Sequence, residues 1–242
     1  MFKKLIRTSS HYSHHIMQFI LPTSCLICSY QTAHPRGICD ACHQALPILP
    51  QSCLCCAQVL WTATSLCGTC LTHPKPFDRT YALFPYQPPI IRFITLLKFN
   101  HELSHAHTLG QLLIEKIKSH WYRNQPLPEL IIPIPLHPKR LQERGFNQAL
   151  EIAKPIGKFF NISIDYHGTK RIKETVAQSG LKAPHRKRNM AHAFATQRSY
   201  AGLHVAILDD VITTGMTVSA CAAVLKQSGA KRIDVWCVAR RE

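Results

Sequence analysis

The sequence predicts an α/β fold with a parallel sheet, preceded by a small cysteine-rich domain. Three observations support this prediction. The C-terminal half alternates short apolar runs with stretches of helical periodicity. Eight of the 11 cysteines lie in C-x-x-C pairs near the N-terminus. One apolar run leads into two adjacent acids and a loop of small residues, an arrangement typical of the ligand-binding edge of a parallel sheet.

The composition is that of a folded and strongly basic protein. Apolar residues make up 46% of the 242 residues and charged residues 17%, which excludes a disordered chain. The chain has 29 Lys and Arg against 13 Asp and Glu, a formal net charge of +16. A charge of this size attracts polyanions at long range. Nucleic acid, nucleotides, pyrophosphate-bearing metabolites and an anionic membrane surface all remain open as partners.

The N-terminal segment does not have the pattern of an export signal. Residues 1–24 begin with lysines, but serines and histidines interrupt the segment before a short apolar run, and no small-residue cleavage site follows. No stretch approaches the ~18–20 apolar residues that span a bilayer. We expect an N-terminal helical extension over 1–24, which packs on the protein or lies on a surface, and a soluble cytoplasmic protein without a membrane span.

The element pattern predicts three segments: the extension 1–24, a cysteine domain 25–76 and an α/β domain 77–242. Within 77–125, apolar residues recur at helical spacing, and Pro88 and Pro89 are placed to open the first helix. Further along the chain, short apolar runs predict strands at 130–136, 162–166, 204–208 and 232–238. Periodic stretches predict helices at 147–160, despite Pro155, and at 217–227, before Gly229. Strands that alternate with helices favour a parallel sheet.

The cysteines form a duplicated unit with the spacing C-x2-C-x10-C-x2-C, and each position of the second unit follows the first by 28 residues. Four thiolates at this spacing are the ligands of a structural zinc site, because two C-x-x-C turns complete a tetrahedron. We therefore expect two Zn2+ ions. The sequence leaves open whether Cys55 or Cys56 is a ligand, and whether the pairs combine consecutively or crosswise. The candidate ligands are Cys25, Cys28, Cys39, Cys42, Cys53, Cys56, Cys67 and Cys70.

Such a site has a structural role. Four cysteine ligands leave no open coordination position, so a site of this kind does no chemistry and instead folds a segment too short to bury a core. Zinc ribbons also present surfaces to nucleic acid or protein. A purely structural appendage and a binding surface are both compatible with the sequence.

The segment 205–217, VAILDDVITTGMT, predicts a phosphate site. An apolar strand is expected to end at the two acids, and a helix is expected to begin near Thr217, so that backbone N–H groups and threonine hydroxyls surround a phosphate. Gly215 permits close backbone approach. The acids can accept hydrogen bonds from a ribose diol and can reach Mg2+. The segment lacks the lysine of a Walker A loop and the glycines of a dinucleotide fold, so we expect a ribose 5-phosphate. The candidate residues are Asp209, Asp210, Val211, Thr213, Thr214, Gly215, Met216 and Thr217.

This segment resembles the phosphoribosyl-pyrophosphate (PRPP) signature of type I phosphoribosyltransferases. The resemblance implies a phosphoribosyltransferase-like fold in which the paired acids hold the ribose hydroxyls and the loop holds the 5-phosphate, with Mg2+ accompanying PRPP. That family also has a pyrophosphate loop after an earlier strand. In this chain the corresponding positions are Pro135, Leu136, Lys139 and Arg140.

A double cysteine unit joined to such a domain resembles the ComF family of competence proteins. Four more motifs carry the resemblance: KFN at 98–100, RGFNQA at 144–149, TVAQSGL at 175–181 and RKRN at 186–189. The extra cysteine in CLCC at 53–56 departs from the pattern. The resemblance implies a role in natural transformation, in the uptake and cytoplasmic handling of single-stranded DNA, beside a helicase-like partner.

The same motifs supply a predicted basic cleft. Arginine forks can neutralise a pyrophosphate or a DNA backbone, and carboxamides suit a ribose or a base edge. No residue stands out as catalytic, so a phosphoribosyltransferase with an unknown acceptor stays open. The rivals are a non-enzymatic single-stranded-DNA-binding module regulated by PRPP and a helicase adaptor. The residues of the cleft, besides those of the pyrophosphate loop, are Arg144, Asn147, Gln178, Arg186, Arg188 and Asn189.

Overall fold

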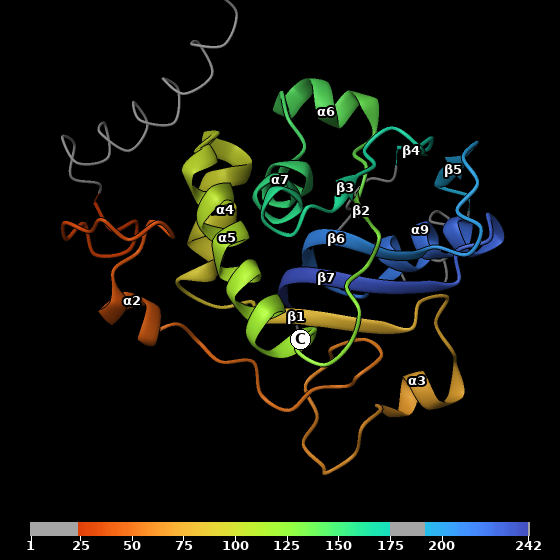
Figure 1. Ribbon diagram of the computed structural model, residues 1–242, viewed down its shortest axis with the longest axis horizontal. Coiled ribbons are helices and arrows are strands. Elements are labelled where there is room, and N and C mark those ends of the chain that lie inside the picture. Colours follow the sequence, from red (N-terminus) through yellow and green to blue (C-terminus); the bar gives the residue numbers. More distant parts are fainter. Residues whose placement is uncertain (1–23, 175–191, 242) are drawn as a thin grey trace, which may run out of the picture. The chain divides into compact units, whose positions relative to one another are not determined.

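The computed structural model describes residues 24–174 and 192–241, which form two compact units divided between Leu46 and Pro47 (Figure 1). The helical extension expected over 1–24 lies, except for Ser24, outside the described residues. Among the described residues, no helix is both long and apolar enough to cross a membrane.

The first unit contains the first cysteine set. A bridge joins Ser24 to Gln31, and the Cys25 N–H donates to the Tyr30 carbonyl at 2.7 Å, which closes the first C-x-x-C turn. Ser29 has a positive φ of 61° at the end of this turn. The short helix α2 (Asp40–Gln44) begins after Cys39.

The second cysteine set repeats this geometry position by position. A bridge joins Ser52 to Val59, the Cys53 N–H donates to the Gln58 carbonyl at 2.8 Å, and Ala57 has a φ of 56°. Helix α3 (Gly68–Thr72) begins after Cys67, as α2 begins after Cys39. The repeat of 28 residues in the sequence is therefore a repeat of the backbone hydrogen bonds as well.

A parallel sheet forms the centre of the second unit, as the sequence predicts, and it has five strands. The central strands carry apolar residues that are buried on both faces, which is typical of a parallel sheet covered by helices. A separate antiparallel pair joins β4 (Thr169–Arg171) to β5 (Phe194–Thr196). In spatial order the sheet consists of β1 (Arg79–Pro85), β7 (Arg232–Arg240), β6 (His204–Ile212), β2 (Leu130–Pro133) and β3 (Ser163–Ile164).

Helices cover both faces of this sheet. On β6, Val205 and Ile207 belong to a buried cluster with residues of α9 (Met216–Gln227). Leu208, the next residue along the strand, points to the other face and is also fully buried. Helix α7 (Gln148–Phe160) packs on β2 and β6 and also against α5. The remaining helices are α4 (Ile90–Asn100), α5 (Leu103–Lys116), the π-helical turn η1 (Ile117–Trp121) and α6 (Pro138–Arg144).

The close approach of α5 to α7 depends on a glycine. A Cβ at Gly110 would lie 2.4 Å from the Pro155 ring and 3.0 Å from the Ile152 carbonyl. Pro155, inside α7, thus occupies the space that any larger residue at position 110 would need. The expected helix over 147–160 is confirmed, with Asn147 as its N-cap.

Three expectations about elements are wrong. The first strand, β1, lies inside the stretch 77–125, for which the sequence predicts helices. Its sequence, RTYALFP, is buried through most of its length and therefore lacks the alternation that indicates a strand. The strand expected to end at the acids continues through them to Ile212, since the parallel partner β7 pairs with it up to Arg240. The strand expected at 162–166 is reduced to two residues.

The second cysteine set packs into the α/β domain. Ala57 belongs to the buried cluster that contains the β6 and α9 residues, and the Thr80 N–H donates to the Leu54 carbonyl at 3.2 Å. These contacts explain why the structure divides the chain between 46 and 47, whereas the sequence suggests a boundary between 76 and 77. The first cysteine set alone forms the small unit with residues up to Leu46.

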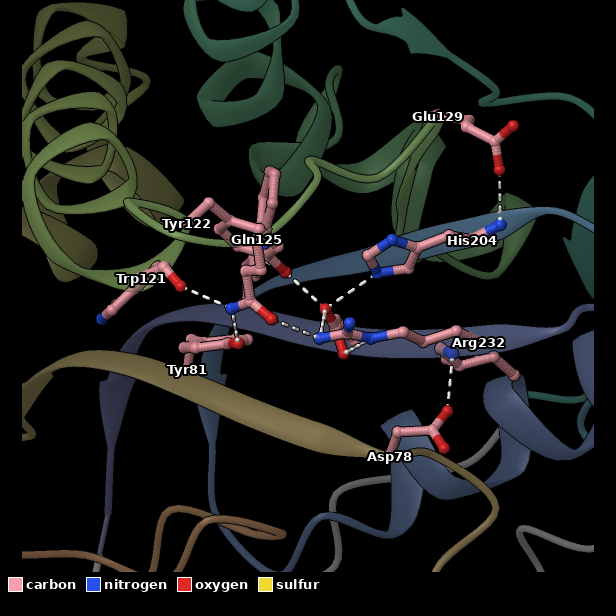
Figure 2. Close-up of polar contacts among 11 residues, drawn as sticks. Asp78, Tyr81, Trp121, Tyr122, Gln125, Glu129, His204 and Arg232 are labelled. Carbon is pink, nitrogen blue, oxygen red and sulfur yellow. Dashed lines mark hydrogen bonds and ion pairs between the residues drawn. The ribbon is translucent and has the colours of Figure 1, made fainter.

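A buried carboxylate organises the amino end of the sheet. Asp234 of β7 is fully buried, and its Oδ2 accepts hydrogen bonds from the Tyr122 hydroxyl at 2.5 Å and from the His204 ring at 2.8 Å. Arg232 adds a bond from Nε to Oδ1 at 3.1 Å. Figure 2 shows how Gln125 extends this network, with its amide between Tyr81 and the Trp121 carbonyl. Burial raises the pKa of Asp234, but these donors outweigh it and hold the pKa below its ordinary value.

Asp234→Asn should destabilise the protein by about 3 kcal/mol, because it leaves the buried donors and the Arg232 charge without a carboxylate. The midpoint of urea unfolding measures this change. Glu129→Gln is the matched control: it makes the same exchange at an exposed residue that accepts the His204 N–H, so it should change stability by less than about 0.5 kcal/mol. Equal midpoints for the two variants would contradict the proposed role of Asp234.

Candidate functional site

The predicted phosphate segment lies at the carboxyl edge of the parallel sheet. Asp209 and Asp210 are in the second half of β6, and residues 213–215 form a turn before α9. Gly215 is the N-cap of α9 with a φ of 73°, a left-handed conformation that favours glycine. Thr213 and Thr214 are exposed. The helix begins at Met216, one residue before its expected start.

Asp210 is a buried anion with a specific cation. Its side chain forms an ion pair with Lys98 of α4 and accepts a hydrogen bond from the Gln148 Nε2 of α7 at 3.1 Å. Only 2% of Asp210 is exposed. Burial raises the pKa of this carboxyl, but Lys98 and Gln148 outweigh burial and lower the pKa below its usual value. Asp210 is therefore the ionised member of the acidic pair.

Asp209 has the opposite electrostatic environment. Its Oδ1 accepts the Asp210 backbone N–H at 2.9 Å. Burial and the negative charge of Asp210 raise the pKa of Asp209 to about 8. The two adjacent acids thus differ in protonation at neutral pH, with the proton on Asp209. An incoming cation or hydroxyl donor at this edge would shift that balance.

Two motifs far apart in the sequence meet at Asp210. Lys98 belongs to KFN, and Gln148 belongs to RGFNQA. The Arg144 guanidinium donates to the Gln148 Oε1 at 2.6 Å, so Arg144 orients the amide that holds Asp210. Burial lowers the pKa of Arg144, while the charge of Asp210 acts against this effect.

The other predicted cleft residues have different positions. Asn147 accepts the Ala149 N–H at 3.0 Å and donates to the Ile134 carbonyl at 2.9 Å, so it caps α7 and fixes the turn after β2. Pro135 and Leu136 are half-buried in that turn. Lys139, on the short helix α6, pairs with Glu174 at 3.2 Å and does not contact the acids.

Arginines from two elements approach the acidic pair. Arg140 is exposed on α6, and its charge lowers the pKa of both Arg144 and Arg171, although burial has the larger effect on each. Arg171 of β4 also feels the charge of Asp209. Arg171 could not be identified from the sequence, because it belongs to no motif. The predicted residues Gln178, Arg186, Arg188 and Asn189 lie outside the described residues.

Lys98 and Gln148 were not expected as site residues, although they lie in the motifs KFN and RGFNQA. A lysine near the end of a predicted helix is most often exposed, and nothing local shows that Lys98 reaches a strand more than 100 residues away. The motif KFN at 98–100 was the available signal for Lys98.

Each cysteine set forms a candidate metal centre. In each set, the four cysteine Sγ atoms all lie within 4.8 Å of one another. The Cys28 and Cys39 sulfurs are 3.8 Å apart, and those of Cys56 and Cys67 are 3.7 Å apart. A tetrahedral zinc with bonds of about 2.3 Å requires sulfur separations of about 3.8 Å, so the residues fit this ion. The pairs combine consecutively, and the group around Cys53 contains Cys56 and excludes Cys55.

The thiols of the second set have different environments, and that of Cys53 favours the thiolate, whereas burial and the charge of Cys53 raise the pKa of Cys56 to about 11. Burial raises the pKa of Cys53, but backbone N–H groups, among them that of Cys67 at 3.3 Å from the sulfur, outweigh it and lower the pKa to about 7. A thiolate is the form that binds zinc. Cys55 instead packs against the buried cluster of the α/β domain, and burial raises its pKa.

Comparisons with known proteins agree with this arrangement. A family model described as a double zinc ribbon domain matches residues 16–73. A DNA utilization protein, YhgH, of Salmonella typhi is 33% identical over 222 residues, which cover 91% of this chain and 98% of the relative. Competence protein F of Haemophilus influenzae is 32% identical over 84% of this chain and 90% of its own length. The chain belongs to the ComF family of competence proteins.

Solved structures that resemble this ComF protein include phosphoribosyltransferases. A purine phosphoribosyltransferase from Pyrococcus horikoshii is 20% identical, with a TM-score of 0.33, over 55% of this chain and 70% of the other. A glutamine PRPP amidotransferase from B. subtilis has the same TM-score over 53% of this chain and 25% of its own. These scores carry no inference about ligands. The sheet order and the two cysteine sets confirm the predicted α/β class with N-terminal four-cysteine ribbons.

The purified protein should contain two zinc ions. Cys56→Ser should reduce the content to one, because it removes a ligand of the second set, whereas Cys55→Ser should leave two. Elemental analysis after gel filtration measures the stoichiometry. Cys55→Ser is the control for Cys56→Ser, because it makes the same exchange at the adjacent position. Loss of zinc from Cys55→Ser alone would reverse the ligand assignment.

Proposed function

We propose that this ComF protein binds PRPP at the carboxyl edge of its sheet and that this binding serves a role in competence and DNA use. One observation carries the proposal: an acidic pair and a helix N-terminus that begins with a left-handed glycine stand next to each other at that edge. In this reading the 5-phosphate lies at residues 213–217, where the helix dipole and backbone N–H groups favour an anion. The names of the relatives support the role in DNA use.

The acidic pair suits the ribose and the metal that accompanies PRPP. Asp210 is held in place by Lys98 and Gln148, so it can orient a hydroxyl without moving. Asp209 carries a proton in the free protein. A Mg2+ ion near the pair would stabilise its ionised form, and Asp209 would release that proton as the complex forms.

The basic residues around the edge suit the pyrophosphate. Arg144 and Arg171 are both half-buried and close enough to the acids to sense their charge. Arginine holds phosphate groups through paired N–H donors. The proposal is one of binding, and transfer to an acceptor is a further step that an acceptor screen would test.

Calorimetric titration of PRPP with Mg2+ tests the proposal. Wild type should bind, and the double variant Asp209→Asn with Asp210→Asn should lose binding, because the amides neither hold the metal nor orient the ribose. Glu129→Gln, an equal exchange outside the edge, should bind as wild type does. No heat from the wild type, in protein with two zinc ions, would refute the proposal.

The affinity for PRPP with Mg2+ should depend on pH. Because the pKa of Asp209 is raised to about 8 in the free protein and falls in the complex, binding releases a proton below pH 8. The affinity should therefore rise with pH, by up to about tenfold per unit, and level off above pH 8. Titrations between pH 6.5 and 9 measure this slope. In Asp209→Asn, the affinity that remains should no longer depend on pH in this range. A slope of the opposite sign would contradict the assigned protonation.

A second candidate function, binding of single-stranded DNA, is favoured by the second ribbon. Residues 47–76 contain no acidic residue, and the chain carries a net charge of +16. Trp61, between Cys56 and Cys67, has 88% of its surface exposed. An exposed indole in a segment without acidic residues suits base stacking. The other aromatics near it in sequence, Phe77, Tyr81 and Phe84, are buried in the fold.

Trp61→Ala should weaken binding of an oligothymidylate by about 1–3 kcal/mol, the range of one stacked base. Fluorescence anisotropy at several salt concentrations measures the affinity, which should fall steeply with salt. Trp61→Phe keeps a ring and should retain most of the affinity. Equal affinities for wild type and Trp61→Ala would remove the second ribbon from the DNA surface.

A further inference from the structure

Arg240, the last residue of β7, connects three separate segments of the second unit. Only 6% of it is exposed, and its guanidinium donates to the second cysteine set, to the end of β6 and to its own neighbour Arg241. We propose that Arg240 is a positioning residue: it aligns the phosphate loop 213–215 and makes that alignment dependent on the folded second zinc ribbon. The inference rests on the proposed function of this loop.

On the loop side, Arg240 fixes two successive peptide groups. Its Nη1 donates to the Ile212 carbonyl at 3.0 Å and to the Thr213 carbonyl. Both peptide bonds are trans, because the only cis bond among the described residues is Pro88–Pro89. In a planar trans peptide, the N–H points opposite to the carbonyl. The N–H groups of Thr213 and Thr214 are therefore directed away from Arg240, and both residues are exposed.

This orientation is what a phosphate loop requires. N–H groups that point outward can converge on an anion, and carbonyls that pointed outward would repel it. The Arg241 N–H also donates to the Ile212 carbonyl, at 2.9 Å, so this carbonyl has two donors. The Thr213 carbonyl, by contrast, accepts a hydrogen bond from Arg240. Loss of the guanidinium would free the 213–214 peptide to rotate.

On the ribbon side, the same guanidinium donates hydrogen bonds to the second C-x-x-C turn and to Gln58 beside it. Its Nε donates to the Cys56 carbonyl at 3.0 Å, and its Nη2 donates to the Gln58 Oε1 at 2.7 Å. Cys56 is one of the four candidate zinc ligands of the second set. Its carbonyl keeps this position only while the C-x-x-C turn is folded, and the fold of such a turn depends on the metal. A lysine could not replace the arginine, because one ammonium cannot span acceptors on opposite sides.

Hydrogen exchange and PRPP titration, performed on the full chain with zinc, test the inference. Arg240→Lys should raise amide exchange at 213–216 and weaken PRPP binding by about tenfold or more, the loss expected when charged hydrogen bonds are removed. Gln58→Ala removes one of the two ribbon-side acceptors and leaves the loop-side bonds in place, and it should raise amide exchange in the loop and weaken PRPP binding by about threefold. Arg241→Lys, the same change at the exposed neighbour, should leave both measurements unchanged.

A chelator series identifies the zinc dependence. In wild type, partial removal of zinc from the second set should raise exchange at 213–216. In Arg240→Lys, whose loop is already loose, the same removal should add little, because two changes on one route are not additive. Additive effects, or a loop in Arg240→Lys that exchanges as slowly as in wild type, would overturn the inference. If wild type fails to bind PRPP, the proposed function fails, and the exchange data still decide whether Arg240 joins ribbon to loop.

Discussion

A buried negative charge at the end of a parallel strand needs a cation, and this need sets much of the architecture around β6. Asp210 is almost fully buried, and an isolated carboxylate in such a place is very costly. Lys98 from α4 supplies the charge, and Gln148 from α7, oriented by Arg144, supplies a donor. Two helices that are distant in sequence are thereby tied to the same strand. The acidic pair is thus held ready at an edge where its geometry is fixed before any ligand arrives.

Strand β7, which lies between β1 and β6, carries a buried polar residue near each of its ends. Near its amino end, Asp234 collects donors from Tyr122, His204 and Arg232. At its carboxyl end the roles are exchanged, because the buried Arg240 donates hydrogen bonds to carbonyl groups. One buried acceptor and one buried donor therefore stabilise opposite ends of one strand. The network at Asp234 lies away from the acidic pair, so it contributes to stability and leaves the ligand edge free for binding groups.

Local patterns in the sequence predicted local structure well. One cysteine unit spans 18 residues and the strand–acid–loop–helix segment spans 13, and both were found at their expected positions. What failed depends on distant partners. β1 has no alternation because both of its faces are covered, and β6 runs past the acids because backbone pairing with β7 is indifferent to side-chain charge.

The contacts of Lys98 and Arg240 could not be predicted for the same reason. Each lies in a segment that, read alone, resembles an ordinary basic surface: the end of a helix for Lys98 and an Arg-Arg pair near the C-terminus for Arg240. Only the fold shows that one neutralises a buried acid and the other satisfies several carbonyls. Placement of Gln148 followed from its capping neighbour Asn147, which starts α7 at the right residue.

The two ribbons illustrate how a duplicated sequence can be divided between folding units. Their turns have the same backbone hydrogen bonds, as expected for copies of one unit. The first copy nevertheless belongs to the small unit, whereas the second contributes Ala57 to the core of the α/β domain. The boundary of duplication and the boundary of folding therefore do not coincide. Selection on the second copy acts through the packing of the larger domain, whereas the first copy is constrained mainly by its own metal turn, and its surface is the freer of the two to diverge.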